Sequence, residues 1–371
     1  MLNVIFIMII YNKCGLGLKE IRMKEQWAFR QNNKLKKQVA AGGKCTNDGY
    51  LYYAYNYTSQ RVMHGEIIKL NIKTLESAVI YSDEFELGRI ILNEDGLIFS
   101  NGYGLIICID FEGNLIWRCD TLTERMPRAI HIDDEYMVYL VGQMLVIERK
   151  TGNIVWKSED VIGVGHVACE RSGKYIYHNG FNQKITRYEL STGKVTWEYG
   201  QYLNIFKIIC KDDNKLLLIH SYGKLEIVDI EKNKRVVLKN IMKGRIVTVP
   251  FVEDNVISFA YRYTETPPKD YKNKVEDIIR WMFTSVRYKE NGDVESLYSV
   301  ELAAEASTPS IITDDNYFYL GTEDRFFYQI DKNTGEIKDK IELSANCSFI
   351  EKKDENIILM LDDGKIVCYE P

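Results

Sequence analysis

The chain has 371 residues, of which 46% are hydrophobic and 27% charged. This is the composition of an ordinary globular protein, and it excludes a disordered chain, a collagen-like fibre and a multi-span membrane protein. The formal net charge is -5, from 48 basic and 53 acidic side chains, so no basic field favours nucleic acid as a partner. Aromatic residues reach 12% and there are only 6 prolines, which together favour β-structure.

The N-terminal segment differs from the rest of the chain. Residues 2–10 form an apolar run that is shorter than the ~20 residues a membrane-spanning helix needs. The run has no positively charged segment before it and no A-x-A cleavage site after it, as a signal peptide would. Met23 opens a polar stretch typical of a cytoplasmic start. We interpret residues 1–22 as a leader of uncertain status, either a dispensable leader or the result of a misplaced start. We predict a cytoplasmic protein, with export or membrane association through the apolar terminus as the alternative.

A repeated unit then runs along the chain. Residues 105–117 form an apolar strand, a polar turn with a glycine and a second strand that ends in Trp. The same pattern returns at residues 144–156 and 184–197, and weaker copies lie at residues 224–235 and 327–337. The turn glycines Gly113, Gly152 and Gly193 are 39 and 41 residues apart. A fixed period of this length is typical of a repeat architecture.

A second polar turn confirms the period, because it occurs eight times and is followed each time by an apolar strand. These turns lie at residues 47–49, 94–96, 133–134, 172–173, 212–214, 254–255, 314–316 and 354–356. Each unit of about 40 residues therefore holds four short antiparallel strands, here called a to d from the channel outward, which is typical of a propeller blade. The predicted fold is an all-β, eight-bladed β-propeller of four-stranded antiparallel blades.

The two ends of the chain complete each other. The last unit has strands near residues 347–351, 357–361 and 365–369, but its strand d is missing. Residues 25–30 carry Trp27 in a context like that of Trp117. We therefore predict that the N-terminal strand completes the last blade, which leaves no free sheet edge between the ends. Residues 23–371 would then form a single propeller domain.

Blade six is longer than the period. The acidic turns at Asp254 and Asp315 are 61 residues apart, about 20 more than one unit. We place the excess as an insertion at about residues 264–281, between strands b and c. Within residues 269–282, Val275, Ile278, Ile279 and Met282 have helical spacing, which predicts a short amphipathic helix.

The repeat resembles a known family. The segment at residues 321–335, and the T-G-x-x-x-W form at residues 151–156 and 192–197, are similar to PQQ-like (quinoprotein-type) β-propeller repeats, and the resemblance covers roughly residues 25–371. It implies the fold but not one function, since the family includes quinone-dependent dehydrogenases, outer-membrane assembly scaffolds and sensor domains of kinases. The dehydrogenases are longer and typically carry a vicinal disulfide against the cofactor, whereas no two cysteines are adjacent here. The resemblance therefore implies no quinone cofactor.

No motif for catalysis or metal binding is found. The eight cysteines include no C-x-x-C pair, and the five histidines include no H-x-x-x-H pair. We interpret Cys108, Cys169, Cys210 and Cys368, which lie in apolar runs, as reduced core residues. The recurrent Trp117, Trp156 and Trp197 are interpreted as packing between blades. We predict no catalytic residue, no metal site and no cofactor.

Candidate binding residues fall on one face. The d–a loops and the b–c turns share a face, here called the loop face, opposite the a–b and c–d turns. Alignment on the a–b turn puts Arg89, Arg128 and Lys207 at one equivalent position, early in strand a and near the mouth of the central channel. Three cations there would attract an anion or an acidic peptide, unless they pair with loop acids such as Glu86 and Glu124.

Aromatic residues mark the same face. Tyr103, Phe181 and Tyr222 lie at the tips of b–c turns, and Trp281 lies in the insertion. Aromatic tips around an irregular insertion are typical of an interaction face. We therefore predict a non-enzymatic scaffold that binds a protein or peptide partner through its loop face, with no nucleic acid partner and no integral membrane span. The alternative is a small-ligand-binding or enzymatic propeller that uses the mouth of the central channel.

Overall fold

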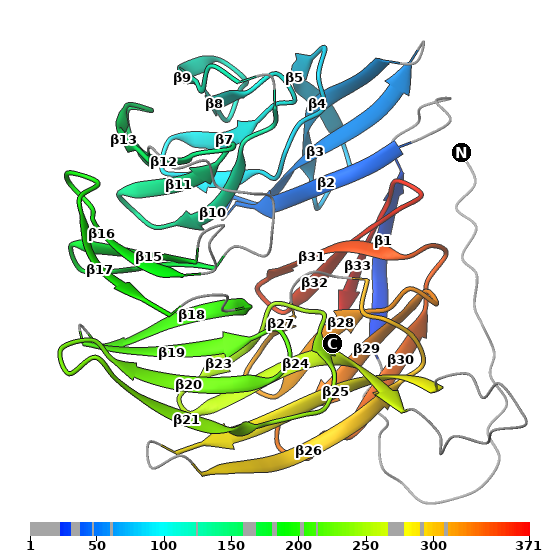
Figure 1. Ribbon diagram of the computed structural model, residues 1–371. Helices are drawn as coiled ribbons and strands as arrows, with labels where there is room; N and C mark the ends of the chain where they lie inside the picture. The colour runs from blue at the N-terminus through cyan, green and yellow to red at the C-terminus, as the bar shows by residue number, and fades with distance from the viewer. Residues whose placement is uncertain are drawn as a thin grey trace, which may run out of the picture.

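The computed structural model describes residues 23–30, 38–46, 48–59, 62–123, 125–158, 168–179, 184–200, 204–212, 214–265, 278–289, 293–307 and 311–371. Every regular element in these ranges is a β-strand, and the strands form eight sheets arranged in a ring (Figure 1). The predicted eight-bladed, all-β propeller is thus confirmed. No helix able to cross a bilayer occurs in the described part of the chain.

Seven blades follow one another along the chain, and the eighth combines both ends. Blade 1 contains β2 (Gln38–Cys45), β3 (Tyr50–Ser59), β4 (Val62–Asn71) and β5 (Ser77–Asp83). Blade 2 contains β6 (Ile91–Asn93), β7 (Gly96–Ser100), β8 (Leu105–Asp110) and β9 (Leu115–Asp120). Blade 3 contains β10 (Arg128–Ile132), β11 (Tyr136–Leu140), β12 (Met144–Glu148) and β13 (Ile154–Lys157). Blade 4 contains β14 (Cys169–Ser172), β15 (Tyr175–Asn179), β16 (Ile185–Glu189) and β17 (Val195–Tyr199).

The second half of the ring has the same order. Blade 5 contains β18 (Ile205–Asp212), β19 (Lys215–His220), β20 (Lys224–Asp229) and β21 (Lys234–Asn240). Blade 6 contains β22 (Arg245–Ile246), β23 (Phe251–Glu253), β24 (Val256–Glu265), β25 (Ile278–Tyr288) and β26 (Val294–Leu302). Blade 7 contains β27 (Ile312–Thr313), β28 (Tyr317–Gly321), β29 (Phe326–Asp331) and β30 (Ile337–Glu342). Blade 8 contains β31 (Cys347–Lys353), β32 (Asn356–Leu361), β33 (Lys365–Glu370) and β1 (Lys24–Arg30).

The ring is closed by the predicted N-terminal strand. Strand β1 pairs antiparallel with β33, from Lys24 opposite Glu370 to Arg30 opposite Lys365. Trp27 packs against the apolar core between blades 8 and 1. Because β1 occupies the outer edge of β33, the closing blade has four strands like its neighbours.

The burial of the middle strands on both faces explains the continuous apolar runs in the sequence. All five residues of β7 and the last five of β19 are buried, because both faces of each middle strand contact a neighbouring blade. The cysteines in the described residues are free thiols, and Cys108 and Cys368 are buried in this core. Trp156 packs against Gly193 of the next blade, and its indole Nε1 donates a hydrogen bond to the Leu190 carbonyl at 2.6 Å. The interpretation of the tryptophans as inter-blade packing holds for this pair.

A β-bulge recurs at one place in the outer strands. In blades 1, 2, 3, 4, 6 and 7 the register of strand d against strand c shifts by one residue, for example at Ile116 in blade 2 and Val155 in blade 3. A bulge bends an exposed edge strand and disfavours pairing with another chain.

The predicted helix in blade 6 is wrong where the structure describes it. Ile278, Ile279 and Met282 belong to β25, which pairs with β24 over ten positions, from Glu265 opposite Ile278 to Val256 opposite Arg287. The ladder satisfies the backbone hydrogen bonds of these residues, and β-branched isoleucines suit a strand. Residues 266–277, including Val275, lie outside the described residues.

Candidate interaction surface on the loop face

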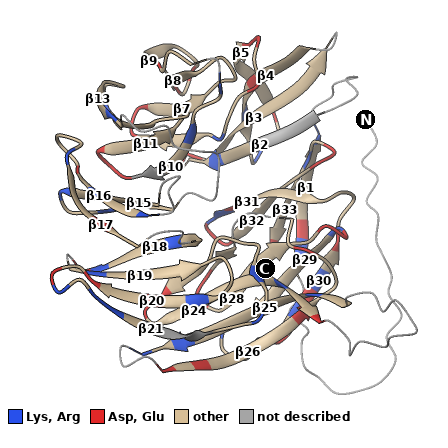
Figure 2. Ribbon diagram, in the orientation of Figure 1, with Lys and Arg blue, Asp and Glu red and all other residues tan. Residues whose placement is uncertain are grey.

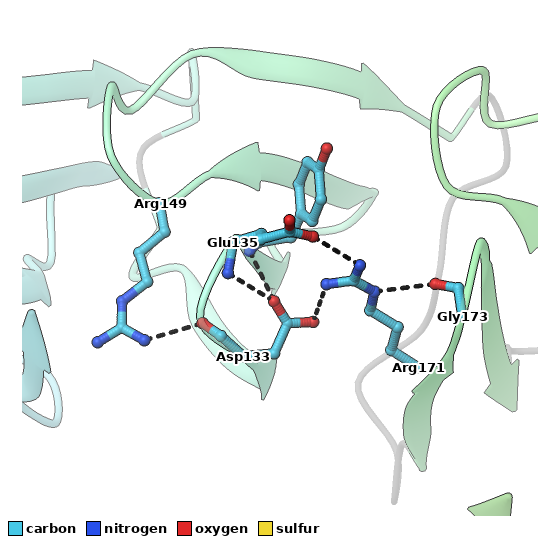
Figure 3. Close-up of polar contacts among 6 residues, drawn as sticks. Asp133, Glu135, Arg149, Arg171 and Gly173 are labelled. Atoms are coloured by element: carbon cyan, nitrogen blue, oxygen red, sulfur yellow. Dashed lines mark hydrogen bonds and ion pairs between the residues drawn. The ribbon is translucent and has the colours of Figure 1, made fainter.

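On the face opposite the loop face, two arginines connect neighbouring blades (Figure 3). Arg149 donates hydrogen bonds to Asn93 Oδ1 at 3.0 Å, to the Asp133 carbonyl at 2.8 Å and to the Leu92 carbonyl. Arg171 bonds the Asp133 carboxylate at 2.8 Å and Glu135 at 2.7 Å. These two guanidinium groups join blades 2, 3 and 4.

The electrostatics of this network agree with a structural role. Burial alone would raise the pKa of Asp133, but the hydrogen bond and charge of Arg171 and the hydrogen bonds from the Tyr136 and Glu135 amides together outweigh it, so the pKa lies below its ordinary value. Both arginines are therefore occupied by neighbouring blades. Around the rest of the ring, positive and negative side chains are interspersed (Figure 2).

The three predicted cations lie at or near the start of strand a in blades 2, 3 and 5, and their surroundings differ. Arg89 is exposed and its guanidinium lies 5.2 Å from the centre of the Phe349 ring in blade 8. Arg128 is exposed at the first position of β10. Lys207 is half-buried and its Nζ donates a hydrogen bond to the Pro250 carbonyl of blade 6 at 2.9 Å. No ion pair is found between Arg89 or Arg128 and another described residue, and Glu124 lies outside those residues.

Lys207 differs from the two arginines in its surroundings. Burial lowers the pKa of Lys207, and the nearby Glu170 carboxylate opposes this effect. Burial raises the pKa of Glu170, and Lys207 opposes that shift in turn. The ammonium group of Lys207 thus belongs to the inner wall between blades 4, 5 and 6 rather than to an open surface.

The predicted aromatic residues differ in exposure and in position. Tyr103 is 50% exposed and stacks on Phe85, with ring centres 5.1 Å apart. Tyr222 is 60% exposed in the b–c turn of blade 5. Trp281 is half-buried within β25, opposite Arg262 and Leu302, and so is not part of a loop tip. Phe181 lies outside the described residues.

The structure adds three apolar residues beside Tyr103. We define the loop-face patch as Met63, Phe85, Tyr103 and Leu122. Phe85, in the loop from blade 1 to blade 2, is 40% exposed, and Met63, near the tip of the β3–β4 hairpin, is 42% exposed. Leu122, in the loop from blade 2 to blade 3, is 84% exposed.

Met63 is aligned with Phe85 by a close contact at Gly65. A Cβ atom on Gly65 would lie 2.8 Å from the Phe85 carbonyl oxygen and 2.4 Å from Leu87 Cγ. Gly65 therefore permits the hairpin of blade 1 to approach the loop of blade 2. Because side chains two residues apart share a face of a strand, Met63 projects on the same side as Gly65, toward blade 2.

Leu122 is fixed beside Tyr103 by its own loop. The Thr121 hydroxyl donates a hydrogen bond to the Gly104 carbonyl at 2.7 Å, and the Leu122 amide donates one to Asp120 Oδ1 at 2.8 Å. Leu122 has a φ of 58°, a left-handed conformation that is strained for a leucine. Strained backbone conformations are common at functional sites, although Leu75 in the c–d turn of blade 1 also has a positive φ, of 60°.

Sequence reasoning found Tyr103 but missed Met63, Phe85 and Leu122. In the sequence, an apolar residue near a hairpin tip or in a loop cannot be distinguished from a core residue, because most strands of this chain are also apolar. The usable signal for Leu122 is its position in Asp120-Thr121-Leu122-Thr123, a single apolar residue between polar ones after strand d.

The described residues show no arrangement for metal chemistry. No three His, Cys, Asp or Glu side chains within those ranges are grouped so that they could hold a metal ion. Crevices of about 370 Å³ lie between neighbouring turns on the face opposite the loop face, one lined by acids and by Arg149 and Lys150, and the other partly apolar. They share Asn93 and Glu94 and lie between blades 1, 2 and 3.

Comparisons with known proteins agree with the fold. Residues 68–205 match the family model described as outer membrane protein assembly factor BamB, a model of PQQ-like repeats. The crystal structure of BamB from Moraxella catarrhalis superimposes with a TM-score of 0.61 at 11% sequence identity, and the match covers 94% of this chain and 100% of that one. No curated protein sequence matches the chain. The resemblance to PQQ-like propeller repeats is confirmed, and the structural likeness at this identity concerns the fold.

Proposed function

We propose that this PQQ-like β-propeller is a non-enzymatic scaffold that binds a protein partner through its loop face. The observation that carries the proposal is the loop-face patch, in which four apolar or aromatic side chains from consecutive turns and loops are exposed and two of them, Phe85 and Tyr103, are stacked. Contiguous exposed apolar surface on a folded domain is typical of an interaction site. The match of residues 68–205 to a family model named for an assembly factor also favours a protein partner.

The chemistry of the patch suits a protein better than a small molecule. Tyr103 and Phe85 are stacked and need little ordering on binding, and aromatic side chains are enriched among the residues that dominate binding energy. The patch follows loop tips across blades 1, 2 and 3. A small-molecule site would instead be concave and would bury most of its ligand.

A photo-crosslinking experiment in cells tests the proposal. A benzophenone amino acid replaces Tyr103 in one variant and Glu231, an exposed turn residue of blade 5 on the opposite face, in a matched control. We expect a discrete adduct of defined mass from position 103 only, and its loss when Leu122→Asp is added. The same adducts from both positions, or no adduct from position 103, would contradict the proposal.

A further inference from the structure

The inner margin of the loop-face patch carries two positive charges that have no ion pair within the described part of the chain. The Gly88 amide donates a hydrogen bond to the Ser100 carbonyl at 2.8 Å, and the Ser100 hydroxyl donates one to the Pro127 carbonyl at 2.8 Å. Ser100 thereby links the residues that directly precede Arg89 and Arg128. The two arginines lie in adjacent blades at the channel side of the patch, and both are exposed.

Arg89 and Arg128 differ in their contacts from Arg149 and Arg171, which bind groups of neighbouring blades. Arg171 makes two short contacts with carboxylates, at 2.7 and 2.8 Å. The Arg89 guanidinium lies over the Phe349 ring and has no hydrogen bond or ion pair to another described residue, and a cation over an aromatic ring keeps its hydrogen-bond donors free. Two exposed guanidinium groups that pair with no carboxylate in the described ranges, beside an apolar surface, are suited to bind carboxylates, because the fork of N–H donors matches a carboxylate in geometry.

Exposed acids lie at the outer margin of the patch. Glu84, directly before Phe85, is exposed, and Asp120 is the exposed last residue of β9. The chain runs inward from Glu84 past Phe85 and the partly buried Glu86 to Arg89, and from Asp120 past Leu122 to Arg128. The apolar side chains of the patch thus lie between the exposed acids Glu84 and Asp120 on the outer side and the two exposed arginines on the channel side. An anionic lipid surface would meet repulsion from the outer acids, and the net charge of -5 adds to it.

We propose that the loop-face patch binds an amphipathic segment of the partner protein, with the acidic border of that segment directed toward Arg89 and Arg128 at the channel mouth. This inference rests on the proposed function. The apolar stripe of the segment covers Met63, Phe85, Tyr103 and Leu122 and supplies most of the binding energy. The charges fix its orientation and accelerate its association.

Fluorescent model peptides test the charge preference. Three peptides share one apolar stripe and carry Glu, Gln or Lys along one polar border. We expect affinity to fall in the order Glu, Gln, Lys, by about three- to fivefold for each arginine engaged at low ionic strength, and the differences to shrink in high salt. In the double variant Arg89→Gln, Arg128→Gln the three peptides should bind alike. The control Lys157→Gln, an exposed cation of β13, should keep the preference.

Other outcomes separate this inference from the proposed function. Equal binding of the three peptides, or no binding of any, would overturn the inference while a crosslink from position 103 still supports the scaffold. Binding to phosphatidylglycerol vesicles that Leu122→Asn abolishes would overturn it in favour of a membrane. A concentration-dependent dimer that the same variant abolishes would overturn it in favour of a second copy of this chain.

Discussion

Trp117 of blade 2 lies against Gly152 of blade 3. A Cβ atom on Gly152 would be 2.4 Å from Trp117 Cε3 and 2.6 Å from Cδ2, so the ring rests directly on the glycine backbone. Tyr298 and Gly335 repeat the relation between blades 6 and 7, where the corresponding distance is 2.3 Å. Trp156 and Gly193 form a third such pair, between blades 3 and 4. In these three pairs, the recurrence of the glycine and the large ring has a physical cause, because the ring in strand d packs on a glycine in the c–d turn of the next blade.

Replacing that glycine should weaken the contact between blades. Gly152 has a φ of 73°, so Gly152→Ala adds backbone strain and also forces the ring of Trp117 to move. We expect a loss of about 2–4 kcal/mol in the free energy of unfolding. Gly142→Ala is the matched control, since Gly142 has a φ of 85° but no atom within 4 Å of its added Cβ. Gly142→Ala should lower the free energy of unfolding by about 1 kcal/mol, as measured by chemical denaturation. Equal losses would show that strain rather than packing explains the glycine.

The repeat made most of the fold predictable from the sequence. Glycines and tryptophans in register identified the blades, and the missing strand after Lys365–Glu370 identified the closure by β1. These features depend on local turn chemistry and on packing that recurs in every unit. The bulge at Ile116 was not predicted, because the residue at the bulge has the same apolar character as its neighbours in the strand.

The candidate site was predictable only in part. Tyr103 could be placed because b–c turns follow the repeat. Phe85 and Leu122 lie in d–a loops, whose length varies, and their exposure depends on contacts between blades such as that of Gly65 with the Phe85 carbonyl. The same limit applies to Lys207, whose equivalence to Arg89 in sequence did not reveal that Lys207 bonds the Pro250 carbonyl.

Leu122 should be dispensable for stability but required for binding. Asn tolerates the left-handed conformation better than Leu does, so Leu122→Asn should leave the free energy of unfolding unchanged or raise it by about 1 kcal/mol. The crosslink from position 103 should be lost, because the most exposed apolar side chain of the patch is gone. Leu115→Asn, which alters an exposed leucine of β9 outside the patch, should retain the crosslink. A large loss of stability in Leu122→Asn would instead assign Leu122 a structural role.

A buried carboxylate in blade 5 should make stability depend on acid pH. Glu226 is fully buried, and its carboxylate contacts Lys224, His220 at 3.3 Å and Arg235 at 3.9 Å. Burial raises the pKa of Glu226, but His220 and Lys224 outweigh it and lower the pKa to about 2. A pKa below the unfolded value stabilises the fold above about pH 4.5, and this contribution is lost as pH falls toward 2.

The variant Glu226→Gln isolates that contribution. At pH 7 it should lose about 3 kcal/mol, since it leaves neighbouring cations without their partner. The difference from the unmodified protein should shrink between about pH 4.5 and pH 2, as measured by denaturant titrations at a series of pH values. Glu231→Gln, in an exposed turn of the same blade, provides a baseline and should show no such difference. A pH-independent loss in Glu226→Gln would contradict the assignment.

Two truncations separate the leader from the closing strand. Removal of residues 1–22 leaves β1 intact and should not change the midpoint of thermal unfolding, as the interpretation of a dispensable leader requires. Removal of residues 1–30 deletes β1, uncovers the edge of β33 and removes Trp27 from the core between blades 8 and 1. We expect a lower unfolding midpoint and aggregation, because an unpaired edge strand is a template for association. If the shorter truncation were as destabilised as the longer one, residues 1–22 would have a role in the fold.

Fractionation of cells expressing each form tests the prediction of a cytoplasmic protein at the same time.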